Sequence, residues 1–234
     1  MRRQALGLRR QHEESRPLGG FRVWYNRLMR LTFAYDREKD IENFVKSSRS
    51  VNNRELTKEM QEYVDAYGPD FTEENLRTFI DGKLAGVDIE SVLTEVRNHW
   101  TTIEDEFIRR AENIFGCVYP VEETTAYLSF NSRCTYNTSE KYFFISLPRI
   151  ASAHRTVMHE LFHFYTWHAF GQVIPKEKYN DIKESLTVLL NLEFADLMNG
   201  EDRGYQQHTE MRQEISRMWR EGKKLNEIIG ILTT

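Results

Sequence analysis

Cysteine is scarce in this chain, and long apolar runs are missing. Only Cys117 and Cys134 occur among 234 residues. Two cysteines are too few for a disulfide scaffold, and we expect both to be reduced because disulfides are rare in the cytosol. No apolar run approaches the roughly 20 residues of a membrane-spanning helix, and the basic N-terminus lacks the apolar segment of a secretory signal. These absences favour a cytoplasmic protein that does not act in a membrane.

An overall excess of positive charge is lacking too, because the formal net charge is -4. Residues 1–28 nevertheless hold seven arginines and only two acids, which leaves about -9 on the rest of the chain. This distribution argues against a nucleic-acid partner. Residues 1–28 show neither helical nor strand periodicity, so we predict a disordered basic extension there, followed by one domain over residues 29–234.

The first half of that domain is predicted to be mostly helical. Apolar residues recur at three- and four-residue steps from Asp88 to Ile114, which predicts one long helix that packs on a core and ends at Gly116. Shorter helices are predicted over 36–48, from an Asn53 cap to Tyr67, and from Asp70 to Gly82.

Aromatic and β-branched residues then become dense, which predicts a small sheet. The predicted strands are 31–35, Val118–Val121, Thr125–Phe130 and Lys141–Leu147. Helices are predicted to follow over Ala153–Phe170, Lys176–Met198, 206–220 and 225–232. The expected fold is therefore α+β, with a small twisted sheet, a long backing helix and a mostly helical C-terminal part.

One predicted helix carries the sequence His159-Glu160-Leu161-Phe162-His163. On a helix, residues four apart lie one above the other, so both imidazoles face one point. Neutral imidazole is a standard zinc ligand. Glu160 lies about 100° round the helix from His159, outside the ligand set but within reach of a metal-bound water. The spacing therefore predicts two metal ligands and a general base on one helical turn.

A catalytic zinc generally has a third protein ligand, and several acids on the next predicted helix compete for that place. Glu193 lies about 180° from Glu184, so both cannot face one metal. Glu177 and Asp181 lie in the first turns, where the helix N-terminus favours acids in any case. Glu184 lies between apolar neighbours, where a carboxylate is costly to bury unless it is paired or binds a metal. These arguments favour Glu184, with Asp181 as the alternative.

From Lys141 to Gly200 the chain resembles the gluzincin metallopeptidases, which carry H-E-x-x-H on one helix and a glutamate ligand on the next. The resemblance implies one zinc per chain held by His159, His163 and Glu184, and hydrolysis of peptide bonds by a metal-activated water with Glu160 as general base. Thermolysin-like members have Asn before the third ligand, and Ser and Asp three and four residues after it. Lys183, Thr187 and Val188 stand there instead, so a close relation to that branch is excluded, and a carboxylate that would orient a ligand histidine is missing from its expected place.

Other parts of the site are less specific. In the resembling enzymes the strand before the metal helix lines the cleft, so Lys141–Leu147 could pair with an extended peptide substrate, although Phe143 is expected in the core. Tyr179, Tyr205 and His208 are candidate donors to the oxyanion. Two alternatives to the peptidase remain: an inactive or regulatory zinc-binding module, and a non-peptidase zinc amidohydrolase.

Overall fold

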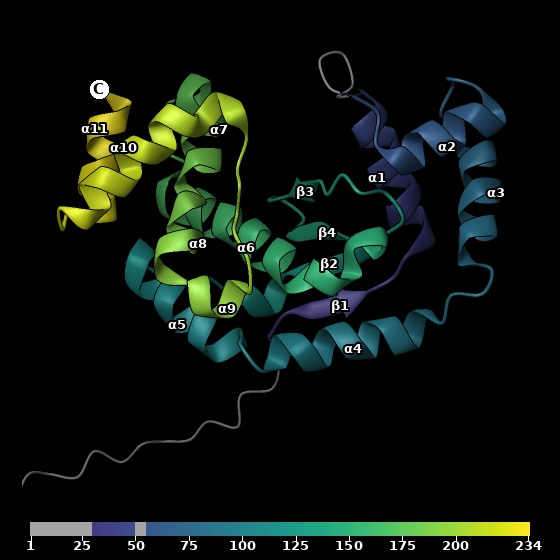
Figure 1. Cartoon of the computed structure of the whole chain (residues 1–234), viewed down its shortest axis with the longest axis horizontal. Coiled ribbons are helices and arrows are strands. Elements are labelled where there is room, and N and C mark those ends of the chain that lie inside the picture. The colour runs from purple at the N-terminus through teal and green to yellow at the C-terminus, as the bar shows by residue number, and fades with distance from the viewer. Residues whose placement is uncertain (1–29, 50–54) are drawn as a thin grey trace, which may run out of the picture.

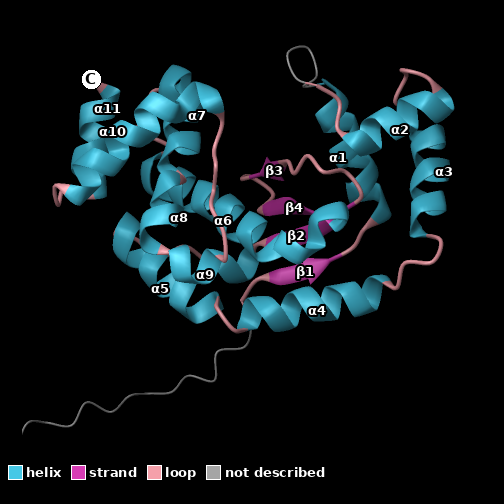
Figure 2. Ribbon diagram, viewed as in Figure 1, coloured by secondary structure: helices cyan, strands magenta, loops and turns pink. Residues whose placement is uncertain are grey.

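The computed structural model describes residues 30–49 and 55–234, so the extension predicted for residues 1–28 lies outside it. In the described residues, helices surround one small mixed sheet, and the fold is α+β (Figures 1 and 2). The strands are β1 (Thr32–Ala34), β2 (Thr125–Ser129), β3 (Tyr136–Asn137) and β4 (Tyr142–Ser146). The helices are α1 (Arg37–Arg49), α2 (Lys58–Tyr67), α3 (Glu73–Leu84), α4 (Ile89–Thr101), α5 (Glu104–Phe115), α6 (Ala153–Phe170), α7 (Lys176–Leu186), α8 (Val188–Glu193), α9 (Ala195–Met198), α10 (Thr209–Arg220) and α11 (Leu225–Thr233).

The sheet has the order β1-β2-β4-β3, with β1, β2 and β4 parallel and β3 antiparallel to β4. Alternate residues of β4 face opposite sides, as the pleat requires. Phe143 and Ile145 join the main core, which α6 also lines, and the predicted burial of Phe143 is thus confirmed. On the other side, the Tyr142 hydroxyl accepts a hydrogen bond from Lys46 of α1. Strand β4 is therefore covered on both faces.

A strand predicted at Val118–Val121 is absent. Pro120 interrupts that segment, and Val121–Glu123 form a 3-10 turn. Proline has no N–H to donate to a ladder and is poorly tolerated inside a sheet. The turn ends at Thr124, whose carbonyl accepts a hydrogen bond from the N–H of Thr32 in β1. The segment therefore joins the sheet only at its end.

The long helix predicted over Asp88–Ile114 is instead two helices, α4 and α5, that meet at Thr102 and Ile103. The Thr102 hydroxyl donates to the carbonyl of His99, and such local bonds compete with helix propagation. After the bend, the buried Glu104 carboxylate accepts from the Trp100 indole at 2.9 Å and from the N–H of Leu31 at 3.0 Å. The interruption therefore ties the backing helices to the start of β1.

The helix predicted over Lys176–Met198 is divided as well, into α7, α8 and α9. The first break is at Thr187, whose hydroxyl donates to the carbonyl of Glu184 at 2.8 Å and to Asp202 Oδ1 at 3.0 Å. Two N-caps also differ from the prediction. Thr57 caps α2, while Asn53 lies outside the described residues, and Thr72 caps α3, which starts three residues after the predicted Asp70.

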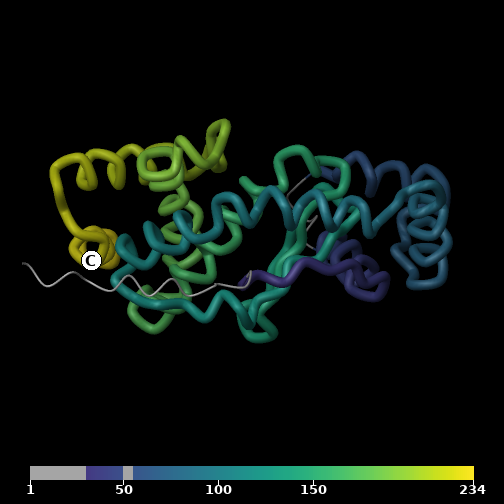
Figure 3. Tube along the Cα trace, turned by 90° about the horizontal axis from the view of Figure 1, so that it is seen from below, coloured from purple at the N-terminus to yellow at the C-terminus, as the bar shows by residue number. Residues whose placement is uncertain are grey.

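Helix α6 has the predicted bounds. It starts after Ser152, ends at Gly171 and is buried on most of its circumference. It packs against α5, α4 and β4, in the middle of the larger of two hydrophobic clusters. The smaller cluster joins α1, α2 and α3. Figure 3 shows α1–α3 (purple to blue) and the C-terminal helices (yellow) at opposite ends of the molecule, with α6 between them. His159, Glu160 and His163 therefore lie on a central helix that is packed on several sides.

Neither described cysteine is in a disulfide. Among the described helices, none combines the length and apolar character needed to cross a membrane.

Candidate metal centre

Helix α6 presents His159 and His163 on one face, one turn apart. Their ring centroids lie 4.5 Å apart and their planes are inclined by 79°. The His163 side chain is 2% exposed and that of His159 is 22% exposed. Two imidazoles one turn apart at the edge of a core are the arrangement that the four-residue spacing predicts.

Helix α7 brings Glu184 to the same point. Its Oε2 lies 3.8 Å from His159 Nε2 and 3.6 Å from His163 Nε2. Within residues 30–49 and 55–234, these are the three His, Cys, Asp or Glu side chains whose donor atoms gather closely enough to hold one ion, all within 4.8 Å of one another. The structure therefore brings together all three sequence-predicted ligands.

The competing acids lie elsewhere. Glu177 and Asp181 are exposed, and Asp181 lies near His208, with Oδ1 3.8 Å from Nδ1. Glu193 accepts a hydrogen bond from the Trp219 indole at 2.6 Å. Of the nearby histidines, His154 bonds to the Met198 carbonyl at 2.9 Å and packs on His99. None of these side chains joins the group.

The geometry of the three donors suits zinc. Nitrogen and oxygen ligands about 2.1 Å from a tetrahedral zinc lie about 3.4 Å apart. The two measured separations from Glu184 Oε2, 3.8 and 3.6 Å, are slightly wider. Two imidazole nitrogens and one carboxylate oxygen form the His₂Glu set of catalytic zinc sites. The donor set therefore fits this metal, with the fourth position left for water or substrate.

Asp202 holds the outer nitrogen of His159. Its Oδ2 lies 2.6 Å from His159 Nδ1, so Nδ1 carries the proton and Nε2 is directed to Glu184. Burial alone would lower the pKa of His159, but the hydrogen bond to Asp202 raises it to about 9. A carboxylate behind a ligand histidine is usual in zinc sites. The carboxylate that orients a histidine, which is missing near Glu184 in the sequence, is thus supplied by Asp202 in the linker after α9.

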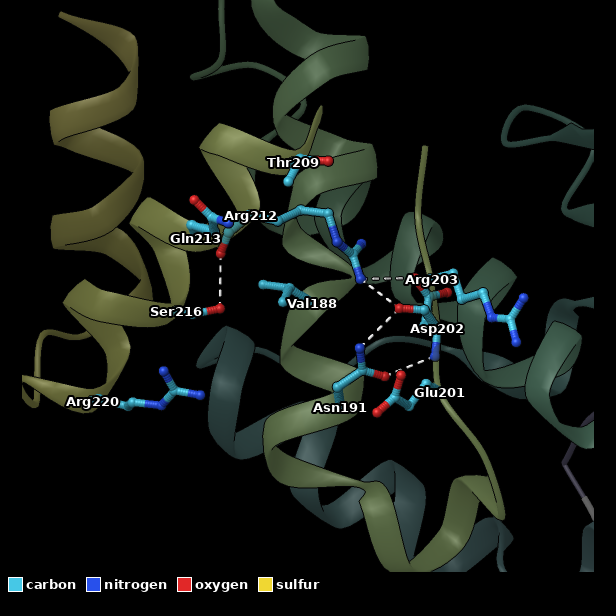
Figure 4. Close-up of a pocket in the computed structure, with 10 residues that line it drawn as sticks. All are labelled: Val188, Asn191, Glu201, Asp202, Arg203, Thr209, Arg212, Gln213, Ser216 and Arg220. Carbon is cyan, nitrogen blue, oxygen red and sulfur yellow. Dashed lines mark hydrogen bonds and ion pairs between the residues drawn. The ribbon is translucent and has the colours of Figure 1, made fainter. Parts of the chain in front are cut away.

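Several side chains fix Asp202 in turn (Figure 4). Arg212 of α10 reaches Asp202 Oδ1 at 3.1 Å and donates to its carbonyl at 2.6 Å. Asn191 of α8 bonds to both its N–H and its carbonyl. Burial would raise the pKa of Asp202, but His159 and Arg212 lower it overall. The carboxylate therefore stays ionised, although no spacing in the sequence identifies Asp202 or Arg212.

Lys183 occupies the other side of Glu184. Its buried ammonium lies 2.7 Å from Glu184 Oε1 and 4.8 Å from the ring centroid of Tyr136. The Tyr136 ring in turn lies 5.5 Å from that of His163. Burial alone would lower the pKa of Lys183, but Glu184 raises it above its ordinary value. Lys183 thus neutralises the Glu184 carboxylate and leaves Oε2 facing the imidazoles.

Glu160 lies beside the donors without joining them. Its side chain is buried, and its Oε2 has no hydrogen-bond partner among the described residues. Burial raises the pKa of Glu160 to about 7, while His159 acts in the opposite direction. His163 Nδ1 is likewise buried without a partner. A buried carboxylate oxygen without a partner is costly, so Glu160 is a candidate for a role beyond packing.

A cleft of about 680 Å³ borders the site and is lined by both His159 and Glu160. Of the three candidate oxyanion donors, Tyr205 lines this cleft. Tyr179 instead packs on Trp167, and His208 is buried. Strand β4 is not the edge of the sheet, because β3 pairs with Tyr142 and Phe143. The prediction that Lys141–Leu147 pairs with a peptide is therefore wrong over this half of the strand, since its outer hydrogen bonds are already used.

The cleft, the three converging donors and the unpartnered carboxylate form one polar centre between α6, α7 and the linker after α9. Such a centre can bind a transition metal and place a base beside it. Comparisons of the chain with protein-family models, with curated proteins and with solved structures found no match.

Proposed function

We propose that this chain is a zinc-dependent peptidase of zincin-like fold. His159, His163 and Glu184 would hold the metal and Glu160 would be the general base. One observation carries the proposal: the buried, unpartnered carboxylate of Glu160 borders the same cleft as His159, next to three converging donors. A site that only stores a metal or stabilises the fold would need the three donors. Such a site would not explain the buried carboxylate of Glu160 beside them.

The order of elements supports the same proposal. Strand β4 leads through a short 3-10 segment into α6, which carries both histidines, and the following helix α7 supplies the glutamate. This is the layout that the resemblance to gluzincins implies. Asp202 supplies, from the linker after α9, the orienting carboxylate that thermolysin-like enzymes carry after their third ligand, and Lys183 stands where those enzymes have Asn.

The residues around the cleft have separable roles in hydrolysis. Zinc, when bound, would supply a Lewis acid for the scissile carbonyl and lower the pKa of water toward neutrality. Glu160 would accept the proton that water loses during attack and pass it to the leaving amine. Its pKa of about 7 suits a group that both takes and gives a proton near neutral pH. Asp202 holds His159 in the tautomer that directs Nε2 to the metal.

The decisive experiment compares wild type with Glu160→Gln. Both proteins should bind about one zinc per chain, because Glu160 is not a ligand, while peptide hydrolysis should fall by at least about a hundredfold in the variant. Zinc content by metal analysis and cleavage of a peptide library are the measurements. Glu201→Gln, at an exposed acid in the same cleft, is the matched control and should keep both properties.

Three outcomes would contradict this assignment. Wild type that holds no zinc removes the metal centre. A Glu160→Gln variant that loses zinc places Glu160 among the ligands, and one that hydrolyses normally removes it as the base. Zinc binding without cleavage of any peptide would instead favour the regulatory module or a different amide substrate.

A further inference from the structure

The cleft beside the metal centre is lined by arginines from four separate segments. Arg133 comes from the loop after β2, Arg149 from the segment between β4 and α6, Arg155 from the first turn of α6, and Arg203 from the linker after α9. Arg133 is anchored, since its guanidinium donates to the carbonyls of Ser47 and Glu55. The other three are available to a ligand.

Several arginines on the described surface lie against acids. Arg37 reaches Asp81 at 2.9 Å and Arg217 reaches Glu214 at 2.7 Å, for example. In contrast, Arg149, Arg155 and Arg203 have no carboxylate within 4 Å in the part of the chain that the structure describes. Unpaired cations grouped in a concave surface create a local positive potential, even in a chain of negative net charge.

The acids of the cleft do not cancel this charge. Asp202 is committed to His159 and Arg212. Glu160 is buried at the edge of the cleft, beside the metal centre. Glu201 is exposed and forms no ion pair with any described residue. Among the described residues, the cleft therefore has three unpaired arginines and one unpaired acid, Glu201, so its net charge is positive. A bound metal would add to that charge.

Two of the arginines are placed by the backbone. Arg155 precedes His159 by four residues on α6, so the two share one face, about 6 Å apart along the axis. Its guanidinium lies where a Cβ on Gly200 would be, so the glycine makes room for it. Arg203 directly follows Asp202, and in Figure 4 its guanidinium points away from Arg212. Arg155 thus lies one turn before His159 on the same helix, and Arg203 is the neighbour of Asp202 in the chain.

We propose that these arginines select peptides that carry a carboxylate within about two residues of the scissile bond. The inference rests on the proposed peptidase function. An extended peptide spans about 3.4 Å per residue, so a carboxylate two residues from a carbonyl at His159 lies level with Arg155. Arginine matches the two oxygens of a carboxylate with two parallel N–H groups. The carboxylate is either an Asp or Glu side chain or the C-terminus of the peptide.

Hydrolysis by the zinc-loaded wild type tests the preference. One set of matched peptides shares a single cleavable bond and carries Glu, Gln or Lys in turn at each position beside that bond. Two further peptides end two residues after the bond, one with a free C-terminus and one with an amidated C-terminus. The Glu peptide should have a kcat/KM about tenfold above that of its Gln counterpart, and the difference should shrink as salt rises. A preference confined to the free C-terminus identifies the α-carboxylate as the source. Equal rates for Glu, Gln and Lys, together with equal rates for both C-termini, would overturn the proposal.

Substitutions then locate the preference. Arg155→Ala, Arg149→Ala and Arg203→Ala should each lower the Glu-to-Gln ratio severalfold while the Gln peptide is cleaved within about twofold of wild type. Arg220→Ala removes an exposed, unpaired arginine that lies outside this cleft, so its ratio should equal that of wild type. If the three variants lose both peptides equally, the arginines are structural and the proposal is wrong.

A binding assay separates this inference from the proposed function. The zinc-loaded Glu160→Gln protein is titrated with fluorescent Glu and Gln peptides, so no turnover is required. Tighter binding of the Glu peptide, lost in the double variant with Arg155→Ala, supports the charge preference even if wild type cleaves nothing. Equal affinities for the Glu and Gln peptides would overturn the charge preference. It would also be overturned if a short single-stranded oligonucleotide displaced the bound peptide at a lower concentration than the Gln peptide does.

Discussion

At the scale of single residues, the hydrogen bond between His159 and Asp202 decides which imidazole nitrogen can face a metal. Outer partners of this kind typically contribute ten- to a hundredfold to metal affinity. Asp202→Asn should therefore weaken zinc binding by about 10- to 100-fold, measured by competition with a chelator. The neighbouring Glu201→Gln is the control, and an Asp202→Asn protein with wild-type affinity would show that the contact has no bearing on the metal.

The proposed third ligand, Glu184, gives a second prediction at this scale. We compare single alanine variants at Glu177, Asp181, Glu184 and Glu193. Zinc affinity should fall strongly only in Glu184→Ala. The fall should exceed the factor of about one hundred that is lost when an outer hydrogen-bond partner of a ligand is removed. The reason is that only the Glu184 oxygen faces both histidines. Loss of zinc in Asp181→Ala with retention in Glu184→Ala would require a rearranged site with an aspartate ligand.

The grouping of three metal-binding side chain types could be predicted from the sequence because each member depends on a short-range pattern. His159 and His163 follow from a four-residue spacing, and Glu184 follows from its apolar neighbours and its distance from the motif. Asp202 could not be predicted, because it lies in an irregular linker and reaches His159 only through the tertiary fold. Lys183 was visible as a departure, but neighbours on a helix point about 100° apart, so spacing did not predict its contact with Glu184 Oε1.

At the scale of elements, Asp40 joins helix α1 to the end of strand β2. Its buried carboxylate accepts from the Ser129 hydroxyl at 2.6 Å and from the N–H of Phe130 at 3.2 Å. Burial nevertheless raises the pKa of Asp40 to about 7. The folded protein therefore holds this proton to higher pH than the unfolded chain does. The stabilisation is complete below the ordinary carboxyl pKa of about 4 and is lost as pH rises through about 7.

Asp40→Asn should remove this dependence, because an amide does not titrate. Urea unfolding of both proteins at several pH values between 4 and 8 should show wild type losing stability relative to the variant, by about 2 to 4 kcal/mol across the range. Asp65→Asn, at an exposed acid on α2, should leave the pH profile of wild type unchanged. A difference in the free energy of unfolding between wild type and Asp40→Asn that did not change with pH would contradict this prediction. It would mean that Asp40 has the same pKa in the folded and unfolded states.

The elements themselves were predictable to different degrees. Helix α6 has its predicted bounds because local signals, an apolar circumference and Gly171, agree with the tertiary fold. The breaks at Thr102 and Thr187 carry no proline or glycine. They depend on hydroxyls that bond to nearby carbonyls and, for Thr187, to Asp202. Periodicity alone continues through such positions, so it predicted one helix where the structure has several.

At the scale of the whole molecule, two hydrophobic clusters share residues at their boundary. Tyr35 and Leu147 pack against both. We therefore expect residues 29–234 to unfold in one calorimetric transition, as a single domain would. Zinc at 100 times its dissociation constant should add about 2.7 kcal/mol to the free energy of unfolding and raise the midpoint by about 5–10 °C.

A protein with His159→Ala is the control for this shift, because it should unfold at the same temperature with and without zinc. The contrary outcome is two separated transitions of which zinc moves only one. In that case helices α1–α3, which form the smaller cluster, would be a second domain that folds apart from the metal centre.

The contact between His159 and Asp202 spans 43 residues of sequence, and this distance has a consequence for biosynthesis. A ribosome adds about 5 to 20 residues per second, so Asp202 is made about 2 to 9 seconds after His159. During that interval the emerging chain carries the imidazoles without the carboxylate that orients one of them. We therefore expect the metal to be acquired near the end of translation or after release, when the C-terminal segment has closed over α6.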